Sequence, residues 1–322
     1  MSYREWKEKH FARCVANLSI YRPECKGQFM CPVCQKMFLP NDLGSKICIA
    51  HAPPEAVNGK PVTLACTDCE KRSSKWDRQV KYEKDMFDRY EKKVVKNVTL
   101  VSDNGTRLPC DLKFNEKDPA KIIAWSTLPP DQLRKVSKKM EADRALDGSL
   151  NLFLDTTKFQ KKDLNSYVAS HLYSAFLIMF SRFGYEYVLS SNAEDIRRVL
   201  IGEENAEKYE KAIIATHNKT PPESISSPTI SIQIAPKNLQ CFIIEIPSPR
   251  KGDASRIIAL PGFGESAKKS YENIMNMAFG AEGGLHFTKT KLNLNMLTRM
   301  LTDPNSKGSG ENLWKEVTMN HL

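Results

Sequence analysis

Residues 31–77 read CPVCQKMFLPNDLGSKICIAHAPPEAVNGKPVTLACTDCEKRSSKWD and contain two C-x2-C pairs with 31 residues between them. Two cysteines at this spacing can direct both sulfur atoms from one tight turn toward a single metal ion. Two such turns complete the tetrahedral thiolate set that Zn²⁺ favours in closed structural sites. Four cysteines can also hold an iron–sulfur cluster, but no other feature of the sequence indicates electron transfer. We therefore predict a structural zinc site formed by Cys31, Cys34, Cys66 and Cys69.

The composition is that of an ordinary soluble globular protein, with 41% hydrophobic and 27% charged residues. The length of 322 residues predicts about two domains. The nine cysteines are an odd number, which argues against a closed set of disulfides. Two C-x2-C pairs in a reducing compartment favour metal binding instead. The charged N-terminus has no signal-peptide pattern, so we expect a cytoplasmic protein.

The most apolar stretch of the chain, residues 167–189, contains His171, Arg182 and Glu186. A membrane span needs about 20 mostly apolar residues without such charges. We interpret the stretch as a buried core helix that runs into a strand, and we expect no membrane partner.

The segment around the cysteines predicts two strands followed by a helix. Lys46 to His51 and Lys60 to Cys66 are rich in Ile, Val, Thr and Leu, which is typical of short strands. From Thr67 the pattern becomes helical and highly charged, through about Lys93. We predict a small zinc-clamped module with flanking helices over residues 1–96.

Residues 97–322 predict a larger α+β domain with antiparallel strands and a central apolar helix. A hairpin is predicted around Asp103-Asn104-Gly105, whose residues tolerate positive φ. The helix is predicted over residues 163–183, where apolar residues recur at spacings of three and four. Residues 259–265 lack the Lys and Ser/Thr of a P-loop, which favours a strand-to-helix turn. Further predictions are strands at 121–126, 151–155, 229–234, 241–246 and 256–260, a Lys-rich helix from Pro129 to about Leu146, and a mobile tail beyond Asp303.

Residues 31–77 resemble the HNH nuclease superfamily, in the subgroup whose ββα-metal fold is held by four zinc-binding cysteines. Besides the two cysteine pairs, the match consists of His51, Pro53, Asn58-Gly59 and the strand before Cys66. Asp77 suits the acidic position that often follows on the helix. The resemblance covers about a seventh of the chain.

The resemblance implies an endonuclease that hydrolyses phosphodiester bonds in DNA with one Mg²⁺ or Mn²⁺ ion. His51 would act as general base on a water, while the metal stabilises the scissile phosphate. The family's acidic metal ligand falls at Ala50, and its asparagine ligand falls at Glu70, whose carboxylate suits hard cations. Asn58, from the glycine-bearing loop, completes the candidate catalytic set. The alternatives are that His51 is a packed strand residue and that Glu70 only stabilises a helix N-terminus.

The net charge of +10 is unevenly distributed. Residues 1–96 hold 19 Lys and Arg against 12 Asp and Glu, which leaves 29 against 26 for the remainder. A local basic field attracts phosphate backbones and releases counterions. The alternative is a charged face that maintains solubility, with ion pairs to acids of the same helix. The candidate nucleic-acid contacts are Lys71, Arg72, Lys75 and Arg78.

Three functions are therefore open. The first is an HNH endonuclease acting on DNA. The second is a binding protein that keeps the zinc fold and the basic surface without catalysis. The third is a protein-interaction module in which zinc replaces a core too small to fold unaided. The sequence does not indicate the oligomeric state or decide between DNA and RNA.

Overall fold

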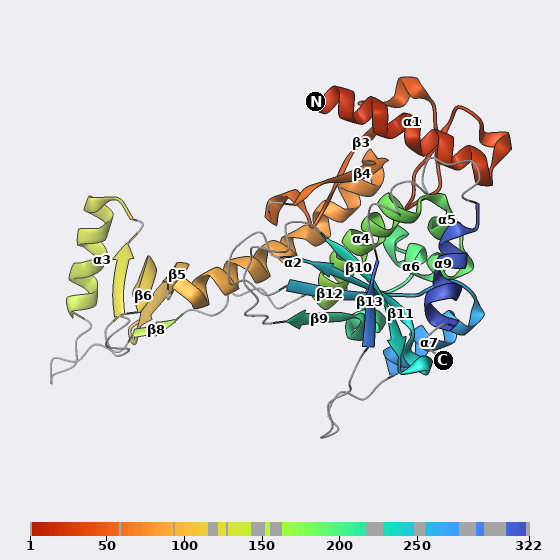
Figure 1. Ribbon diagram of the computed structural model, residues 1–322. Coiled ribbons are helices and arrows are strands. Elements are labelled where there is room, and N and C mark those ends of the chain that lie inside the picture. The colour runs from red at the N-terminus through yellow and green to blue at the C-terminus, as the bar shows by residue number, and fades with distance from the viewer. Residues whose placement is uncertain are drawn as a thin grey trace. The chain divides into compact units, whose positions relative to one another are not determined.

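A computed structural model describes residues 2–57, 59–92, 94–114, 122–126, 128–142, 152–154, 163–216, 228–247, 255–276, 288–292 and 307–319. Helices and antiparallel sheets make up this part of the chain, which confirms the α+β fold class (Figure 1). The chain divides into two compact units, unit 1 with residues 1–80 and 164–322 and unit 2 with residues 81–163. No helix among the described residues has the length and apolar character needed to cross a bilayer.

The N-terminal part of unit 1 consists of a helix, two short hairpins and a second helix. Helix α1 (Tyr3–Tyr21) begins at a capping box, in which Ser2 and Glu5 each accept a hydrogen bond from the other's backbone N–H. Strands β3 and β4 pair and α2 follows β4 directly, as the sequence predicted. The short strands β1 and β2, which the sequence did not predict, also pair. The remaining elements are η1 (Pro23–Cys25), β1 (Phe29–Met30), β2 (Met37–Phe38), η2 (Pro40–Asp42), β3 (Ile47–Ala52), η3 (Glu55–Val57), β4 (Lys60–Cys66) and α2 (Thr67–Lys92).

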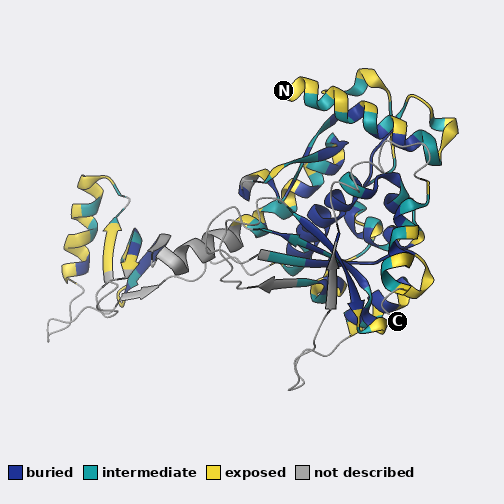
Figure 2. Cartoon of the chain, viewed as in Figure 1, coloured by how far each residue is buried: buried dark blue, intermediate teal, exposed yellow. Residues whose placement is uncertain are grey.

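The C-terminal part of unit 1 is built around a five-stranded antiparallel sheet with the order β13-β10-β11-β12-β9. The predicted apolar helix is α4 (Leu164–Phe183), which is buried along nearly its whole length (Figure 2). It contacts both the β3–β4 hairpin and the strands β11 and β12. The other elements are α5 (Tyr185–Val188), α6 (Ser191–Ile201), η5 (Ala206–Ala212), β9 (Ile213–Thr216), β10 (Thr229–Ala235), η6 (Lys237–Leu239), β11 (Cys241–Ile246), β12 (Ser255–Leu260), α7 (Glu265–Asn276), β13 (Thr288–Lys291) and α9 (Ser309–Met319).

One hydrophobic core joins the two parts of unit 1. It includes Phe11 and Leu18 of α1, Phe29 beside the first cysteine pair, and side chains of α4 and the five-stranded sheet. The contacts therefore divide the chain differently from the boundary after residue 96 that the sequence suggested. The physical reason lies in α4, because a helix that is apolar on all sides must be covered on all sides. Both sequence-distant parts supply that cover.

The prediction of a strand after the apolar helix is wrong, because residues 185–188 form the short helix α5. Gly184, with a φ of 58°, separates α5 from α4. The turn of α5 is closed by a hydrogen bond from the Leu189 N–H to the Tyr185 carbonyl, at 2.9 Å. A short apolar run of this kind cannot be assigned to strand or helix from periodicity alone.

The prediction of a mobile tail beyond Asp303 is also wrong in part, because residues 309–319 form helix α9. Trp314 of this helix is only 3% exposed. Gly262, in the turn between β12 and α7, lies so close to Trp314 that an added Cβ would be 2.2 Å from the indole ring. The backbone N–H of Glu311 also donates to the Glu186 carboxylate, at 2.7 Å. The strand-to-helix turn predicted over residues 259–265 is confirmed, and α9 packs against it.

The described residues of unit 2 form a four-stranded antiparallel sheet with the order β7-β6-β5-β8, helix α3 and the last turns of α2. The predicted hairpin is confirmed, and Gly105 in its turn has a φ of 78°. A small core is formed by Val98, Leu100, Cys110 and Leu112. The elements are β5 (Val94–Ser102), β6 (Arg107–Phe114), β7 (Ile122–Ser126), α3 (Pro130–Ala142) and β8 (Leu152–Leu154).

Candidate metal centre

The two cysteine pairs come from two different local structures. Cys31 and Cys34 belong to the turn between β1 and β2, where the Cys31 N–H donates to the Lys36 carbonyl at 2.9 Å. The Gln35 N–H donates to the Cys31 carbonyl at 2.9 Å, and Gln35 adopts a left-handed φ of 57° that tightens the turn. Cys66 ends β4, and Cys69 lies in the first turn of α2. Each pair is thus held by backbone hydrogen bonds at a defined turn.

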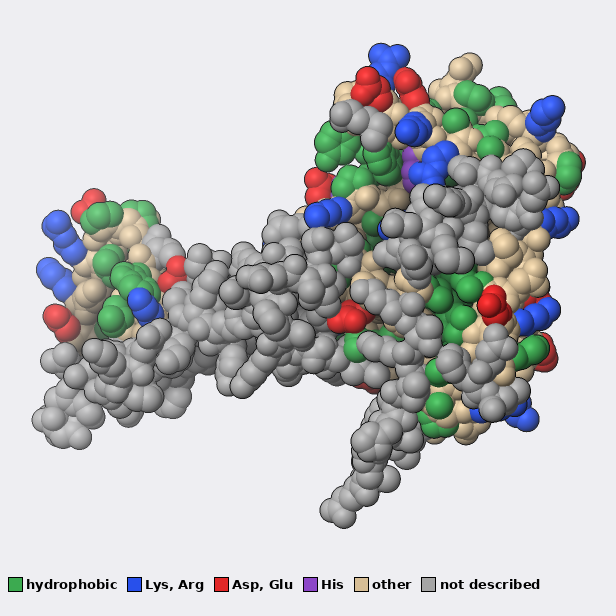
Figure 3. Space-filling view, viewed as in Figure 1, with side chains coloured by type: hydrophobic (Ala, Val, Ile, Leu, Met, Phe, Trp, Pro, Cys, Tyr) green, Lys and Arg blue, Asp and Glu red, His purple; other side chains and the backbone are tan. Residues whose placement is uncertain are grey.

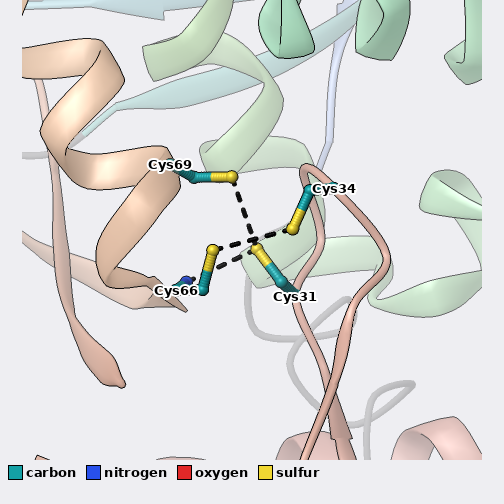
Figure 4. Close-up of side chains that lie close together, drawn as sticks. All are labelled: Cys31, Cys34, Cys66 and Cys69. Atoms are coloured by element: carbon teal, nitrogen blue, oxygen red, sulfur yellow. Dashed lines mark hydrogen bonds between the residues drawn. The ribbon is translucent and has the colours of Figure 1, made fainter. Parts of the chain in front are cut away.

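The four sulfur atoms converge on one point (Figure 4), and all of them lie within 4.8 Å of one another. Cys31 Sγ is 3.9 Å from Cys69 Sγ, and Cys34 Sγ is 3.6 Å from Cys66 Sγ. Four sulfurs at the usual Zn–S distance of about 2.3 Å would be about 3.8 Å apart in a tetrahedron. A disulfide would require about 2.05 Å. The four cysteines could therefore hold a metal ion such as zinc.

The electrostatics of the cluster also suit a cation. Hydrogen bonding to Cys31 lowers the pKa of Cys34, and it lowers the pKa of Cys66 to about 7. Burial instead raises the pKa of Cys31. Four thiolates this close repel one another strongly, so full ionisation requires a compensating positive charge. The backbone N–H of Cys66 donates to Cys31 Sγ at 3.4 Å, which adds a further favourable dipole.

The cysteine turn is anchored in the core of unit 1. The Tyr185 hydroxyl donates to the Met30 carbonyl and accepts from the Met30 N–H, next to Cys31. Asn17 of α1 accepts from the Tyr185 N–H at 2.8 Å. The metal centre is therefore tied to α1 and α5 by buried polar contacts, rather than standing as an independent module.

The candidate base His51 lies on β3, opposite Pro61 of β4, after a shift in the pairing register. Its side chain is partly exposed, and it forms no hydrogen bond to any residue that the structure describes. Ala50, which the sequence resemblance aligns with an acidic metal ligand, is fully buried opposite Thr63. Asn58 lies outside the described residues.

The candidate ligand Glu70 points toward helix α4. Its Oε1 accepts a hydrogen bond from the Tyr173 hydroxyl at 2.5 Å. Burial raises the pKa of Glu70 to about 7, so the carboxyl is about half protonated near neutral pH. A carboxyl in this state is a weak ligand for Mg²⁺ or Mn²⁺, which prefer charged oxygen. No interaction in the described structure joins Glu70 to His51.

Other acids near the cysteines are engaged elsewhere. Asp42 pairs with Lys46 at 2.8 Å, and Asp68 lies 3.8 Å from Lys36. Among the described residues, the four cysteines form the only group of three or more His, Cys, Asp or Glu side chains placed to hold a metal. The structure thus brings together the predicted zinc ligands and does not assemble a second metal site from the predicted catalytic residues that it describes.

In the first turns of α2, two acids face inward and three bases are exposed, while the exposed Asp68 lies 3.8 Å from Lys36. Lys71, Lys75 and Arg78 are exposed, and they lie on one side of the helix because their spacings are four and three. None of them forms an ion pair with a residue that the structure describes. Arg72 differs, because its Nη1 donates to the Leu200 carbonyl of α6 at 3.3 Å.

One acid of the same helix, Asp77, faces away from this basic side. Asp77 points toward α4, where Ser170 Oγ donates to its Oδ1 at 3.0 Å. Burial raises the pKa of Asp77 to about 6. The partners of the two inward acids, Tyr173 and Ser170, were missed from sequence because they lie about a hundred residues away. The spacing of Ser170 and Tyr173 on α4 is an ordinary one for residues on one side of a helix, so it gives no signal of these contacts.

Comparisons of the chain with protein families, with curated proteins and with solved structures return no match. The site is therefore interpreted from its own geometry.

Proposed function

We propose that the chain is a zinc-stabilised nucleic-acid-binding protein without a hydrolytic centre of its own. The observation that carries this proposal is the run of three exposed bases on α2, beyond Asp68, which lies 3.8 Å from Lys36. Glu70 and Asp77 face α4 and are held there by hydroxyl donors. Lys71, Lys75 and Arg78 remain exposed on the other side.

Zinc has a structural role in this proposal. A set of four thiolates leaves no open coordination position, so the ion joins the β1–β2 turn to the junction of β4 and α2 and performs no chemistry. Such sites supply folding free energy directly, because the ligands come together only in the folded chain. The ion would fix the start of α2 and therefore the direction in which its basic side faces.

The basic side suits a phosphate backbone. Lysine and arginine side chains one turn apart on a helix can contact successive phosphates, and each contact releases counterions. Three such contacts to duplex DNA predict a salt dependence of log K with a slope of about −2.7 against log salt. We favour DNA as the partner. Measuring the affinity for RNA under the same conditions would distinguish the two.

An HNH-type endonuclease that uses His51 as general base is the second candidate. One specific observation favours it, namely that the strand bearing His51 pairs with β4 and is followed by α2 in the ββα order. Two observations weigh against it. Ala50 carries no ligand atom, and Glu70 is partly buried and accepts a hydrogen bond from Tyr173.

One set of variants tests both candidates. We would measure binding of labelled duplex DNA to the full chain by fluorescence anisotropy at several salt concentrations. The K71A/K75A/R78A variant is expected to bind more weakly and to show a shallower salt slope. The matched control is K237A/K269A/K307A, which removes three exposed lysines from the C-terminal half. Equal effects of the two triple variants would overturn the proposal.

Cleavage is tested on the same preparations. Plasmid nicking that requires Mg²⁺ or Mn²⁺ and disappears in His51→Ala would establish the second candidate. Binding without nicking in either protein would support the first. Nicking that persists in His51→Ala would indicate a contaminating nuclease.

A further inference from the structure

The outer face of strand β7 in unit 2 exposes two large apolar side chains. Ile123 is 49% exposed and Trp125 is 47% exposed. They are two residues apart on the strand, so they project from the same face of the sheet. The strand order makes β7 an edge of this sheet among the described residues. The indole of Trp125 is therefore accessible from solvent at the margin of unit 2.

Charged side chains flank this apolar pair. Ile123 pairs across the sheet with Lys113 of β6, and Trp125 pairs with Asp111. Directly opposed residues share a face, so exposed Lys113 lies beside Ile123 and diagonally across from Trp125, whose direct neighbour is Asp111. Arg107 is also exposed at the start of β6. Figure 3 shows hydrophobic side chains next to Lys and Arg on the visible face of unit 2.

The whole unit carries an excess of positive charge. Residues 81–163 hold 18 Lys and Arg against 14 Asp and Glu. Helix α3 contributes four basic side chains that are all exposed, Arg134, Lys135, Lys138 and Lys139. Proteins that bind single-stranded nucleic acid combine such a positive surface with aromatic side chains on which bases stack.

We propose that this face of unit 2 binds single-stranded nucleic acid, with an unpaired base stacked on Trp125 and a phosphate contacting Lys113. An unpaired base is required because the bases of a duplex are already stacked on each other and offer no free face. A protein partner fits less well, because the cores of protein interfaces are depleted in lysine. The inference takes its class of partner from the proposed function, but it depends on different residues in a different unit.

Intrinsic fluorescence provides the first test on the full chain. Trp125 is the one exposed tryptophan of the four, since Trp6 and Trp76 are partly buried and Trp314 is buried. We expect oligo(dT) to quench wild-type fluorescence, and we expect most of that quenching to be absent from Trp125→Phe. Equal quenching of the two proteins would overturn the proposal.

Binding of the same oligonucleotide provides the second test. Trp125→Ala is expected to weaken binding roughly tenfold, given the usual contribution of one base–aromatic stack. Trp125→Phe should stay close to wild type because it keeps an aromatic face. Lys113→Ala should reduce the salt slope by about 0.7, the value for one phosphate contact on a single strand. The matched control is Tyr3→Ala, which removes a 67% exposed aromatic residue from unit 1.

The two proposals fail in different ways. Loss of duplex binding in K71A/K75A/R78A with no effect of Trp125→Ala on oligo(dT) would overturn only the present inference. The reverse pattern would overturn only the proposed function of α2. Competition by poly-glutamate that matches oligo(dT), and that is lost in Trp125→Ala, would assign the face to an acidic peptide instead.

Discussion

The hydroxyl of Tyr173 lies 2.5 Å from Oε1 of Glu70, so the central helix engages the acid that the sequence resemblance suggested as a metal ligand. The contact joins α2 to α4 and keeps Glu70 away from the solvent-facing side of its helix. It follows that Glu70 serves the packing of unit 1 in this structure.

Removing that hydroxyl should destabilise the protein. In Tyr173→Phe, the buried Glu70 carboxyl loses its donor, and an unsatisfied buried polar group costs about 1–3 kcal/mol. The measurement is the free energy of unfolding in urea at pH 7. Tyr3→Phe is the control, because Tyr3 is exposed and far from α4 in sequence. If the two variants unfolded at the same urea concentration, the Tyr173–Glu70 contact would not contribute to stability.

Replacing Asp77 with asparagine should stabilise the protein at neutral pH. Burial raises the folded-state pKa of Asp77 to about 6, from the ordinary value of 3.8. Because the folded value is the higher one, the contribution of Asp77 to stability is greatest below pH 3.8 and falls as the pH rises from 3.8 to about 6. Asparagine can still accept from Ser170 and has no charge to bury. Because Asp77 is partly exposed, we expect a gain of about 1–2 kcal/mol.

This gain should depend on pH. Unfolding free energies of Asp77→Asn and wild type are compared at pH 7.5 and at pH 4, with Glu272→Gln as an exposed carboxyl control. The difference should shrink at pH 4, where the folded protein already holds Asp77 neutral. A gain of the same size at both pH values would contradict the assignment to the charge of Asp77.

His10 should make the protein sensitive to mild acid. It is largely buried, its Nε2 lies 3.0 Å from Thr63 Oγ1, and burial lowers its pKa to about 4 from 6.5. The neutral imidazole is therefore favoured in the folded state. The stability that comes from keeping His10 neutral is fully present above pH 6.5 and is lost as the pH falls toward 4. The total loss in the free energy of unfolding is about 3 kcal/mol.

The contribution of His10 can be separated from acid loss of a bound metal, which also occurs in this range. His10→Gln keeps a polar group near Thr63 without a titrating ring. Wild type should lose more stability than His10→Gln between pH 7 and pH 4.5, measured by chemical denaturation. Parallel losses in the two proteins would show that His10 does not titrate on unfolding.

Loss of metal should unfold unit 1 as a whole, because the cysteine turn shares its core with α4 and the five-stranded sheet. We expect one zinc per chain by elemental analysis, and we expect a chelator to lower the melting temperature. The change should reach Trp314, whose ring centroid is 4.9 Å from that of Phe242. Near-ultraviolet circular dichroism would report it.

A pair of cysteine variants provides the control for the metal. Cys34→Ser removes one ligand and should abolish stoichiometric zinc. Cys25→Ser removes a partly exposed thiol outside the cluster and should leave zinc unchanged. Zinc retained by Cys34→Ser at full stoichiometry would contradict a site made of these four sulfurs.

The elements around the cysteines were predictable from local sequence, because C-x2-C spacing, strand composition and charge periodicity are local signals. The strand pair, the long helix α2, the apolar helix α4 and the hairpin at Gly105 were all predicted on such grounds. The short helix α5 and the terminal helix α9 were not. Tyr185 contacts Met30, which is 155 residues away in sequence, and Trp314 packs against Gly262. No local sequence pattern predicts either contact.

By itself the sequence determined the four cysteines of the candidate metal centre and the order of two strands and a helix around them, since each depends on residues close together in the chain. Only the tertiary structure decided where the acids of α2 face and which half of the chain completes the core. Those choices depend on long-range packing against α4, whose Tyr173 and Ser170 hydroxyls donate to Glu70 and Asp77, while the lysines stay in water. The sequence shows how many acids and bases α2 carries, and only the fold decides which of them face α4 and which face solvent.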